Sequence, residues 1–279
     1  MVMYSVVLQT TRSAMLKNKT ILLTGANGGI GTEIAKLLSE QGAMLILAGL
    51  NQPELEALNH QLGGKHAVVE ADIASEQGRQ SILSVCEQDN INLDIVLNNA
   101  GVGQFSLLAD MNETAVTRII DINLTSTILL SQALLPLLLA RPRAEIINIG
   151  SILGSIGFPG STVYCASKFG IRGFTEALRR ELLDTSISVR YFAPRATKTA
   201  INNDDVVSMN NELGTKMDAA EHVAKQLVSF LKESTSNKFL GFPENLFIRI
   251  NSILPGIVDK SIYKQLPIIK RYLIRNIEQ

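Results

Sequence analysis

The sequence predicts an α/β protein with one parallel sheet covered by helices on both faces, and three observations support this fold class. Short apolar or β-branched runs alternate with longer helical patterns along the chain. A glycine-rich turn follows the first apolar run and opens a helical pattern. Apolar residues make up 46% of the 279 residues, which is sufficient for a large buried core.

The expected strands are continuous apolar segments, which is typical of parallel strands buried on both faces. They lie at 20–24 (TILLT), 45–48, 67–71, 94–98, 145–149, 188–192 and 238–242. Helical segments between them predict right-handed crossovers, and hence a Rossmann-type doubly wound sheet. The sequence contains no internal repeat and no Pro/Gly/Ser-rich linker, so we expect a single domain.

The two ends of the chain differ from its centre. Residues 1–14 lack the basic segment and long apolar run of a signal peptide, and Met15 is a more natural start. We therefore expect an N-terminal extension at 1–14, a main domain at 15–242 and an apolar and basic tail at 243–279. The most apolar stretch, 128–140, contains Ser131, Gln132 and Pro136, which favours a buried helix over a membrane span.

Composition also limits the classes of partner. The chain has 26 basic and 26 acidic residues, so it lacks the overall positive charge of a nucleic-acid-binding protein, and a small molecule is the expected partner. Cys86 and Cys165 lie far apart without a CxxC motif or a histidine cluster. This pattern favours a reducing compartment, core packing roles for both thiols and no metal site.

The turn after the first strand reads GANGGIG and supplies Gly25, Gly29 and Gly31 where a helical pattern begins at Thr32. Glycines in this position let the backbone approach a pyrophosphate, and the N–H groups of the first helical turn bind its negative charge. The alternative is a tight turn without a ligand.

The segment YCASK places Tyr164 and Lys168 four residues apart, on one face of an expected helix. Taken alone, the pair is also compatible with a solvated i,i+4 contact. Three further segments accompany it: the glycine-rich turn, NNAG at 98–101, and Ser151 thirteen residues before Tyr164. In this combination and order, residues 15–200 resemble the short-chain dehydrogenase/reductase family.

The resemblance implies an oxidoreductase that transfers hydride between a nicotinamide and a carbonyl or secondary alcohol. Its catalytic residues would be Asn123, Ser151, Tyr164 and Lys168. Tyr164 would act as general acid or base, and we expect Lys168 to lower the pKa of Tyr164 by its charge. Ser151 would hydrogen-bond the substrate oxygen, the alternative being a turn or helix-cap serine, and Asn123 would order a water and the lysine in a proton relay.

The resemblance also implies a cofactor site for NAD or NADP. Its residues would be Gly25, Asn27, Gly29, Ile30, Gly31, Asp72, Ile73, Asn98, Ala100, Gly101, Tyr164, Lys168, Pro194 and Thr199. Asp72 is also a candidate helix cap. After the second strand, Gly49 and Leu50 stand where an acid for NAD or a base for NADP is usual, and Asn51 would bind either. The absence of an acid slightly favours NADP.

Two segments depart from the family pattern or fall outside it. Arg195 stands where a glycine is usual after Pro194, and it would contact an anionic substrate or point to solvent. Residues 200–217 are polar and poorly periodic, which is compatible with a mobile substrate lid or a plain surface loop.

The tail beyond residue 242 interleaves apolar residues with six basic and three acidic side chains, on helical fragments interrupted by Pro255 and Pro267. It is expected either to contact a membrane surface or to pack on its own domain or a twin subunit. Such tails are similar to those of lipid- and steroid-handling members of the family, which implies a hydrophobic substrate. We expect a cytoplasmic homo-oligomer, or one peripheral at a membrane; the rival hypothesis is a catalytically idle NAD(P)-binding regulator.

Overall fold

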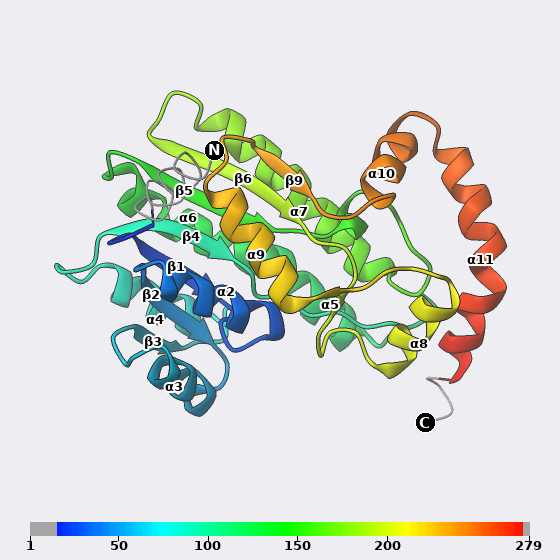
Figure 1. The fold of residues 1–279 in the computed structure, drawn as a ribbon, viewed down its shortest axis with the longest axis horizontal. Helices are drawn as coiled ribbons and strands as arrows, with labels where there is room; N and C mark the ends of the chain where they lie inside the picture. The colour runs from blue at the N-terminus through cyan, green and yellow to red at the C-terminus, as the bar shows by residue number, and fades with distance from the viewer. Residues whose placement is uncertain (1–15, 276–279) are drawn as a thin grey trace, which may run out of the picture.

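A computed structural model of the chain describes residues 16–275, and its centre is a parallel sheet of seven strands (Figure 1). The strands are β1 (Thr20–Thr24), β2 (Met44–Gly49), β3 (Ala67–Glu70), β4 (Leu93–Asn98), β5 (Ala144–Ile149), β6 (Ile187–Ala193) and β9 (Asn237–Phe239). Each predicted apolar run overlaps one of these strands, and the predicted fold class is confirmed.

The strand order β3-β2-β1-β4-β5-β6-β9 reverses direction between β1 and β4. In doubly wound sheets, the chain segments that leave the two strands at such a reversal run to opposite faces of the sheet, and a crevice for a ligand opens between them. The glycine-rich turn follows β1 and the NNAG turn follows β4. The topology therefore brings these two motifs together at one end of the sheet.

Helices cover both faces of the sheet because each has an apolar face to bury. On one face lie α2 (Gly29–Glu40), α3 (Gln52–Gln61) and α9 (Ala220–Leu231), whose apolar residues share one core with the sheet. On the other face lie α4 (Glu76–Cys86), α6 (Ser126–Leu139) and α7 (Thr162–Glu181), which share a second core. Cys86 belongs to this second core, as the sequence predicts.

A long helix runs from Glu113 to Leu139 and consists of α5 (Glu113–Ile120), a π-helical turn (Asp121–Thr125) and α6. Within residues 16–275 it is the one helix long and apolar enough to cross a membrane by length and composition, and 44% of its most apolar window is buried. Leu130, Leu134 and Leu138 pack into the core against the sheet. The stretch is therefore a core helix, as predicted, and Pro136 is accommodated inside it.

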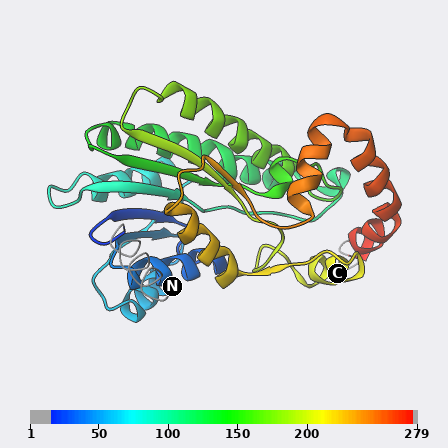
Figure 2. The same ribbon diagram turned by 45° about the horizontal axis from the view of Figure 1, so that its top comes forward.

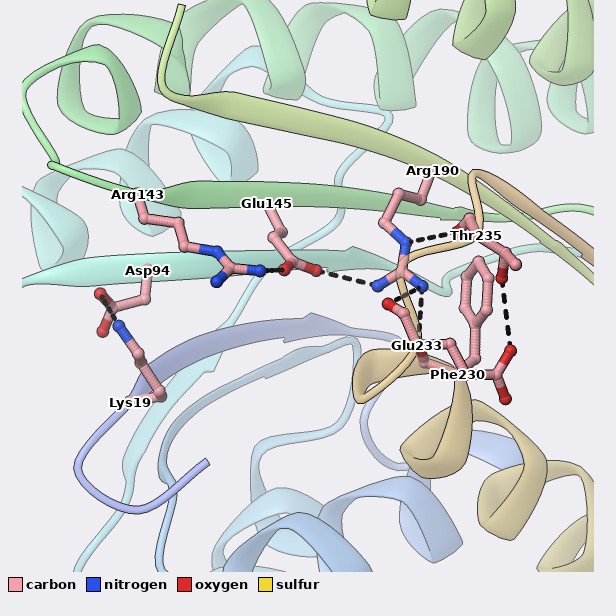
Figure 3. A network of polar contacts seen from close by, with 8 residues as sticks. All are labelled: Lys19, Asp94, Arg143, Glu145, Arg190, Phe230, Glu233 and Thr235. Carbon is pink, nitrogen blue, oxygen red and sulfur yellow. Dashed lines mark hydrogen bonds and ion pairs between the residues drawn. The ribbon is translucent and has the colours of Figure 1, made fainter. Parts of the chain in front are cut away.

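A buried polar network joins the sheet to the end of α9 (Figure 3). The Arg190 guanidinium donates to the carbonyl oxygens of Phe230 (2.6 Å), Glu233 (3.0 Å) and Thr235 (3.0 Å), and it pairs with Glu145 at 3.2 Å. It also lies 3.8 Å from the centre of the Phe230 ring. Because the last carbonyls of a helix lack intrahelical partners, Arg190 acts as a C-terminal cap for α9.

The remaining helices lie beyond the carboxyl ends of the strands, and we call α8 (Asp204–Glu212), α10 (Glu244–Ile253) and α11 (Pro255–Arg275) the cap (Figures 1 and 2). Short 3-10 helices occur at Leu108–Asp110 and Ile152–Gly154. Two short strands, β7 (Thr197–Lys198) and β8 (Asp218–Ala219), form a separate parallel pair that the sequence did not predict.

The cap corrects two expectations. Residues 200–217 contain helix α8 rather than only irregular structure. Pro267 lies inside α11 and does not interrupt it, whereas Pro255 opens that helix, a position where its missing N–H costs nothing. The cap has its own small core of Val206, Met209, Ile269, Tyr272 and Leu273.

The tail is therefore partly packed on its own domain. Ile248, Val258, Ile269 and Leu273 are buried, while Leu246, Ile253, Leu254 and Ile257 remain exposed. The expected N-terminal extension at 1–14 and the start at Met15 lie outside the described residues.

Candidate active site

A cavity of about 700 Å³ extends from the glycine-rich turn, past Tyr164, to the cap. Its lining combines the turns that follow β1, β4, β5 and β6 with side chains of α8, α10 and α11. It therefore lies at the carboxyl ends of the strands, where the topology predicts a ligand site.

The glycine-rich turn has the close packing that the sequence predicts. Gly25 has a φ of 63°, which favours glycine, and a Cβ at Gly31 would collide with the Gly25 carbonyl oxygen. Helix α2 begins at Gly29 and directs its first turn toward the cavity. N–H groups of a first helical turn lack intrahelical acceptors, so this cradle fits a pyrophosphate.

The NNAG turn is fixed to the glycine-rich turn by Thr24. The Thr24 hydroxyl accepts from the N–H groups of Asn99 and Ala100, both at 3.0 Å, and the Asn99 amide donates to the carbonyl oxygens of Thr24 and Gly25. Asn98 differs from the expectation: its side chain donates to Ser131 and Asn148 inside the core, so it does not line the cavity. Its strand position explains this, because successive side chains of a strand alternate in direction.

The π-helical turn holds Asn123 in the core beside the NNAG turn, and Asn123 does not itself line the cavity. Its side-chain oxygen accepts from the Val102 N–H and its amide donates to the Val102 carbonyl, both at 2.8 Å, and to the Ser167 hydroxyl at 3.0 Å. A Cβ at Gly101 would lie 3.2 Å from this oxygen and 3.4 Å from the Lys168 ammonium, so Gly101 does allow a close approach. Asn123 thus positions the 101–102 backbone beside Lys168.

Tyr164 and Lys168 lie on the cavity side of α7, as the four-residue spacing predicts. The Lys168 ammonium is 5.7 Å from the centre of the Tyr164 ring and donates to the Ile149 carbonyl oxygen at 3.1 Å. Burial lowers the pKa of Lys168 to about 8. Burial raises the pKa of Tyr164 to about 12, against a smaller lowering by a hydrogen bond with Ser151.

The sequence predicts a lowered pKa for Tyr164, whereas in this structure its pKa is raised overall. Desolvation of the phenol is the largest cause, and burial also lowers the pKa of Lys168. At neutral pH the phenol holds its proton and is a donor.

Ser151 follows β5, and its hydroxyl lowers the pKa of Tyr164 through a hydrogen bond. The same hydroxyl oxygen accepts from the Leu153 N–H at 3.1 Å. It therefore also caps the short helix Ile152–Gly154, so the alternative reading of a cap serine describes part of its role.

Sequence reasoning missed Tyr191, which holds the Ser151 backbone from behind. The Tyr191 hydroxyl donates to the Ser151 carbonyl oxygen at 3.2 Å and accepts from the Ser151 N–H at 3.4 Å. Its ring fills the space where Gly150 and Gly154 lack side chains. The signal was a tyrosine within a predicted strand, since a buried phenol needs a hydrogen-bond partner.

Near the end of β2, the Glu54 carboxylate is hydrogen-bonded by Asn27 and Asn51, and, contrary to the prediction from the sequence, Asn27 does not line the cavity. A Cβ at Gly49 would collide with the Asn27 side-chain oxygen, and the Asn27 amide donates to Glu54 at 2.7 Å. Asn51 caps α3 by accepting from the Glu54 N–H at 3.1 Å, and its amide donates to the Glu54 carboxylate at 3.0 Å. Sequence reasoning missed Glu54 because it belongs to α3 and not to the strand end.

Asp72 has the cap-like role that was its alternative, since its carboxylate accepts from the Ala74 N–H at 3.0 Å. The buried Ile73 lies next to it at the turn after β3, and neither residue lines the cavity. The structure thus groups Gly25, Gly29, Ile30, Gly31, Ala100, Gly101, Ser151, Tyr164, Lys168, Pro194 and Thr199 around one cavity.

Arg195 lines the cavity, and its guanidinium pairs with carboxylates of the protein and does not point to solvent. Its side chain is 9% exposed and forms two short hydrogen bonds with Asp218, at 2.8 and 2.9 Å. Glu244 lies 3.4 Å from the same guanidinium.

Comparison with known proteins gives consistent matches. The family model described as short chain dehydrogenase matches residues 19–210. The chain is 32% identical over 231 residues to the 3-oxoacyl-(acyl-carrier-protein) reductase FabG of Haemophilus influenzae, covering 81% of this chain and 95% of that protein. It is 34% identical over 188 residues to nodulation protein G of Rhizobium meliloti, covering 67% and 77%.

A solved structure has a similar fold. The short chain dehydrogenase of Burkholderia cenocepacia in complex with NADP matches with a TM-score of 0.75 and 18% identity, covering 88% of this chain and 98% of that one.

Proposed function

This chain belongs to the short-chain dehydrogenase family and is an NAD(P)-dependent oxidoreductase, and from that premise we propose that it reduces the carbonyl of a hydrophobic substrate to a secondary alcohol, with Tyr164 as proton donor. The observation that carries the proposal is the side chain of Tyr164, which faces an apolar cavity with Ser151 and Lys168 beside it.

The bound dinucleotide would supply the hydride, and the residues of the glycine-rich turn, the NNAG turn, Lys168 and Thr199 would hold it. Ser151 donates a hydrogen bond to the carbonyl oxygen and so stabilises the negative charge that develops there. Tyr164 transfers its phenolic proton to the same oxygen as the C–O double bond is reduced. The product is a neutral alcohol, and the phenolate regains its proton from Lys168 or from solvent.

The charge of Lys168 acts after the proton has left Tyr164. A phenol whose pKa is about 12 is a poor source of protons unless the resulting phenolate is stabilised. An ammonium group 5.7 Å from the ring centre provides that stabilisation below its own pKa of about 8. We therefore assign Lys168 an electrostatic role in the forward reaction.

The substrate proposal rests on the walls of the cavity beyond Tyr164. They are largely apolar, and they comprise Phe105, Ile156, Phe158, Ile201, Val206, Met209, Phe242, Phe247, Val258 and Ile262. Such walls favour an acyl, lipid or steroid-like carbonyl compound. A relative whose name specifies a 3-oxoacyl reductase fits this class.

For the cofactor we propose a modest preference for NADP over NAD. No carboxylate stands at the end of β2, and the structurally similar Burkholderia protein is in complex with NADP. The exposed Glu54 carboxylate, held by Asn27 and Asn51, would keep this preference small because it repels a 2′-phosphate. Gly49→Asp would not test the preference cleanly, since any side chain there displaces Asn27.

We also propose that the chain forms a homo-oligomer and, at the cap, contacts a membrane surface from the cytoplasm. Leu129 on α6 and Phe169 on α7 are exposed apolar residues that a twin subunit would cover.

On the tail, which begins at residue 243, the exposed Ile253, Leu254 and Ile257 lie close in sequence to the exposed Lys260. Apolar and cationic side chains together suit an anionic lipid surface. Co-sedimentation with anionic vesicles at low and high salt tests this contact.

A catalytically idle regulator is the weaker reading, because such a protein has no need for Tyr164, Lys168 and Ser151 around an open cavity. The test is a screen of purified protein with NADH and NADPH against ketones and 3-oxoacyl thioesters of increasing chain length. We expect kcat/KM to rise with chain length, and Tyr164→Phe to lose at least about 100-fold in kcat while binding the dinucleotide within a fewfold. Dinucleotide binding without turnover of any carbonyl would instead support the regulator.

A further inference from the structure

Arg195 is a largely buried cation that joins three separate segments. It continues the chain from β6, its two bonds to Asp218 reach the start of β8, and its contact with Glu244 reaches the first residue of α10. Hydrogen bonding and the charges of these two carboxylates hold the pKa of Arg195 above its usual value. The guanidinium therefore stays charged and is fully engaged with the protein.

On one side, Arg195 belongs to the segment 194–199 that borders the expected nicotinamide end of the cavity. The Pro194 carbonyl oxygen accepts from the Ile152 N–H at 3.1 Å, next to Ser151. Thr199 packs against the glycine-rich turn, since a Cβ at Gly29 would lie 2.9 Å from its methyl carbon. A ligand that orders the glycine-rich turn would therefore also order this segment.

On the other side, Glu244 opens helix α10, whose Phe247 lines the cavity. Gly241 precedes it with a φ of 101°, and a Cβ there would lie 2.8 Å from the Arg195 Cδ and 2.7 Å from the Glu244 carboxylate. The chain thus has a glycine where Arg195 must pass to reach Glu244. Further along α10, the Asn251 amide donates to the Ser155 carbonyl oxygen at 2.9 Å.

We propose that Arg195 is a positioning residue that couples dinucleotide binding to the closure of α10 over the substrate cavity. The inference rests on the proposed function only in that a dinucleotide occupies the glycine-rich end. A planar guanidinium can bind one carboxylate with two parallel bonds and still direct a third nitrogen to a second carboxylate, whereas a lysine ammonium cannot hold this geometry. Because such coupling is reciprocal, closure of α10 also strengthens dinucleotide binding.

The test is hydrogen exchange of the α10 amides, residues 244–253, with and without whichever of NADPH or NADH binds. In the unaltered protein we expect the dinucleotide to slow exchange of α10 by at least about fivefold, the lower end of typical coupling between sites. Glu244→Ala and Arg195→Lys should remove most of this slowing. Glu212→Ala is the matched control, because it removes another carboxylate of the cap, one that pairs with Arg271 and Tyr272 on α11, and should leave the slowing intact.

Kinetics provide the second readout. Glu244→Ala should raise KM for a long-chain carbonyl about fivefold or more, with kcat within about twofold, because the cavity wall and not the chemistry is loosened. Equal slowing of α10 exchange by the dinucleotide in the unaltered protein and in Glu244→Ala would overturn the coupling, as would the absence of any slowing in the unaltered protein. Neither exchange result depends on turnover, so a failure of the proposed reductase activity would be seen separately.

Discussion

Replacing Tyr191 by phenylalanine removes one hydroxyl and keeps the ring that packs against Gly150 and Gly154. The variant loses the bond donated to the Ser151 carbonyl oxygen at 3.2 Å and leaves the Ser151 N–H without its 3.4 Å acceptor. A buried polar group left unpaired costs about 1–3 kcal/mol. At roughly 2–4 °C per kcal/mol for a domain of this size, we expect the melting temperature to fall by about 2–12 °C.

The same change should slow catalysis because Ser151 loses its support. Full loss of one donor to a developing oxyanion costs about 100- to 1,000-fold in kcat, and here the serine remains present. We therefore expect an intermediate loss of roughly 5- to 20-fold in kcat. The dissociation constant of the dinucleotide should stay within about twofold, since Tyr191 does not line the cavity.

The assay is steady-state carbonyl reduction beside thermal melting, with Tyr272→Phe as control. Tyr272 also donates its hydroxyl, at 3.0 Å to Glu212, but it belongs to the cap and not to the Ser151 turn. The control should therefore keep its kcat. A Tyr191→Phe protein that melts lower but reduces its substrate at the normal rate would refute a role in positioning Ser151.

Three further predictions concern charge. Reduction should slow as pH rises through the pKa of Lys168 of about 8, because the lysine is charged below that pKa. This fall of kcat/KM at high pH should disappear in Lys168→Ala, and an unchanged pH profile would contradict the electrostatic role. Glu54→Gln should increase kcat/KM with NADPH, relative to kcat/KM with NADH, about fivefold, because it removes about 1 kcal/mol of repulsion between the exposed carboxylate and the 2′-phosphate. A constant ratio would show that the 2′-phosphate lies elsewhere. Burial lowers the pKa of His66 to about 4 in the folded protein, below its usual 6.5, so the unfolded chain binds more protons between these two values. The free energy of unfolding should therefore fall by up to about 3 kcal/mol as pH drops from 6.5 to 4. Urea unfolding of His66→Gln should depend less on pH, and an equal slope for the two proteins would assign the effect to other groups.

The sheet could be predicted from the sequence because parallel strands buried on both faces consist of continuous apolar runs, which are easily recognised. The candidate catalytic residues could be proposed from the sequence because Tyr164 and Lys168 are local in sequence and Ser151 follows a recognisable strand. The partners of these residues come from elsewhere in the chain. Tyr191 meets Ser151 across 40 residues, and Glu54 meets Asn27 across 27. Such pairs have no signature in a single sequence, because only the folded backbone brings them together.

Two further features, an uninterrupted tail helix and the partners of Arg195, could not be predicted because both depend on contacts made only in the folded chain. Pro267 was expected to interrupt the tail helix, but the packing of Ile269 and Leu273 in the cap core outweighs the one hydrogen bond that the proline removes. The carboxylate partners of Arg195 were missed because its residue type alone does not reveal that Asp218 and Glu244 converge on it.

The separate core of the cap has a consequence for how this protein can change. Val206, Met209, Ile269, Tyr272 and Leu273 form a cluster distinct from the two cores on the faces of the sheet. Two of these residues, Val206 and Met209, also line the cavity, so substitutions there reshape one wall of the cavity and leave the packing of the strands and their flanking helices unchanged. Mutational drift at these two positions can therefore change the substrate while the sheet keeps its own cores, and a directed library for new specificities would start there.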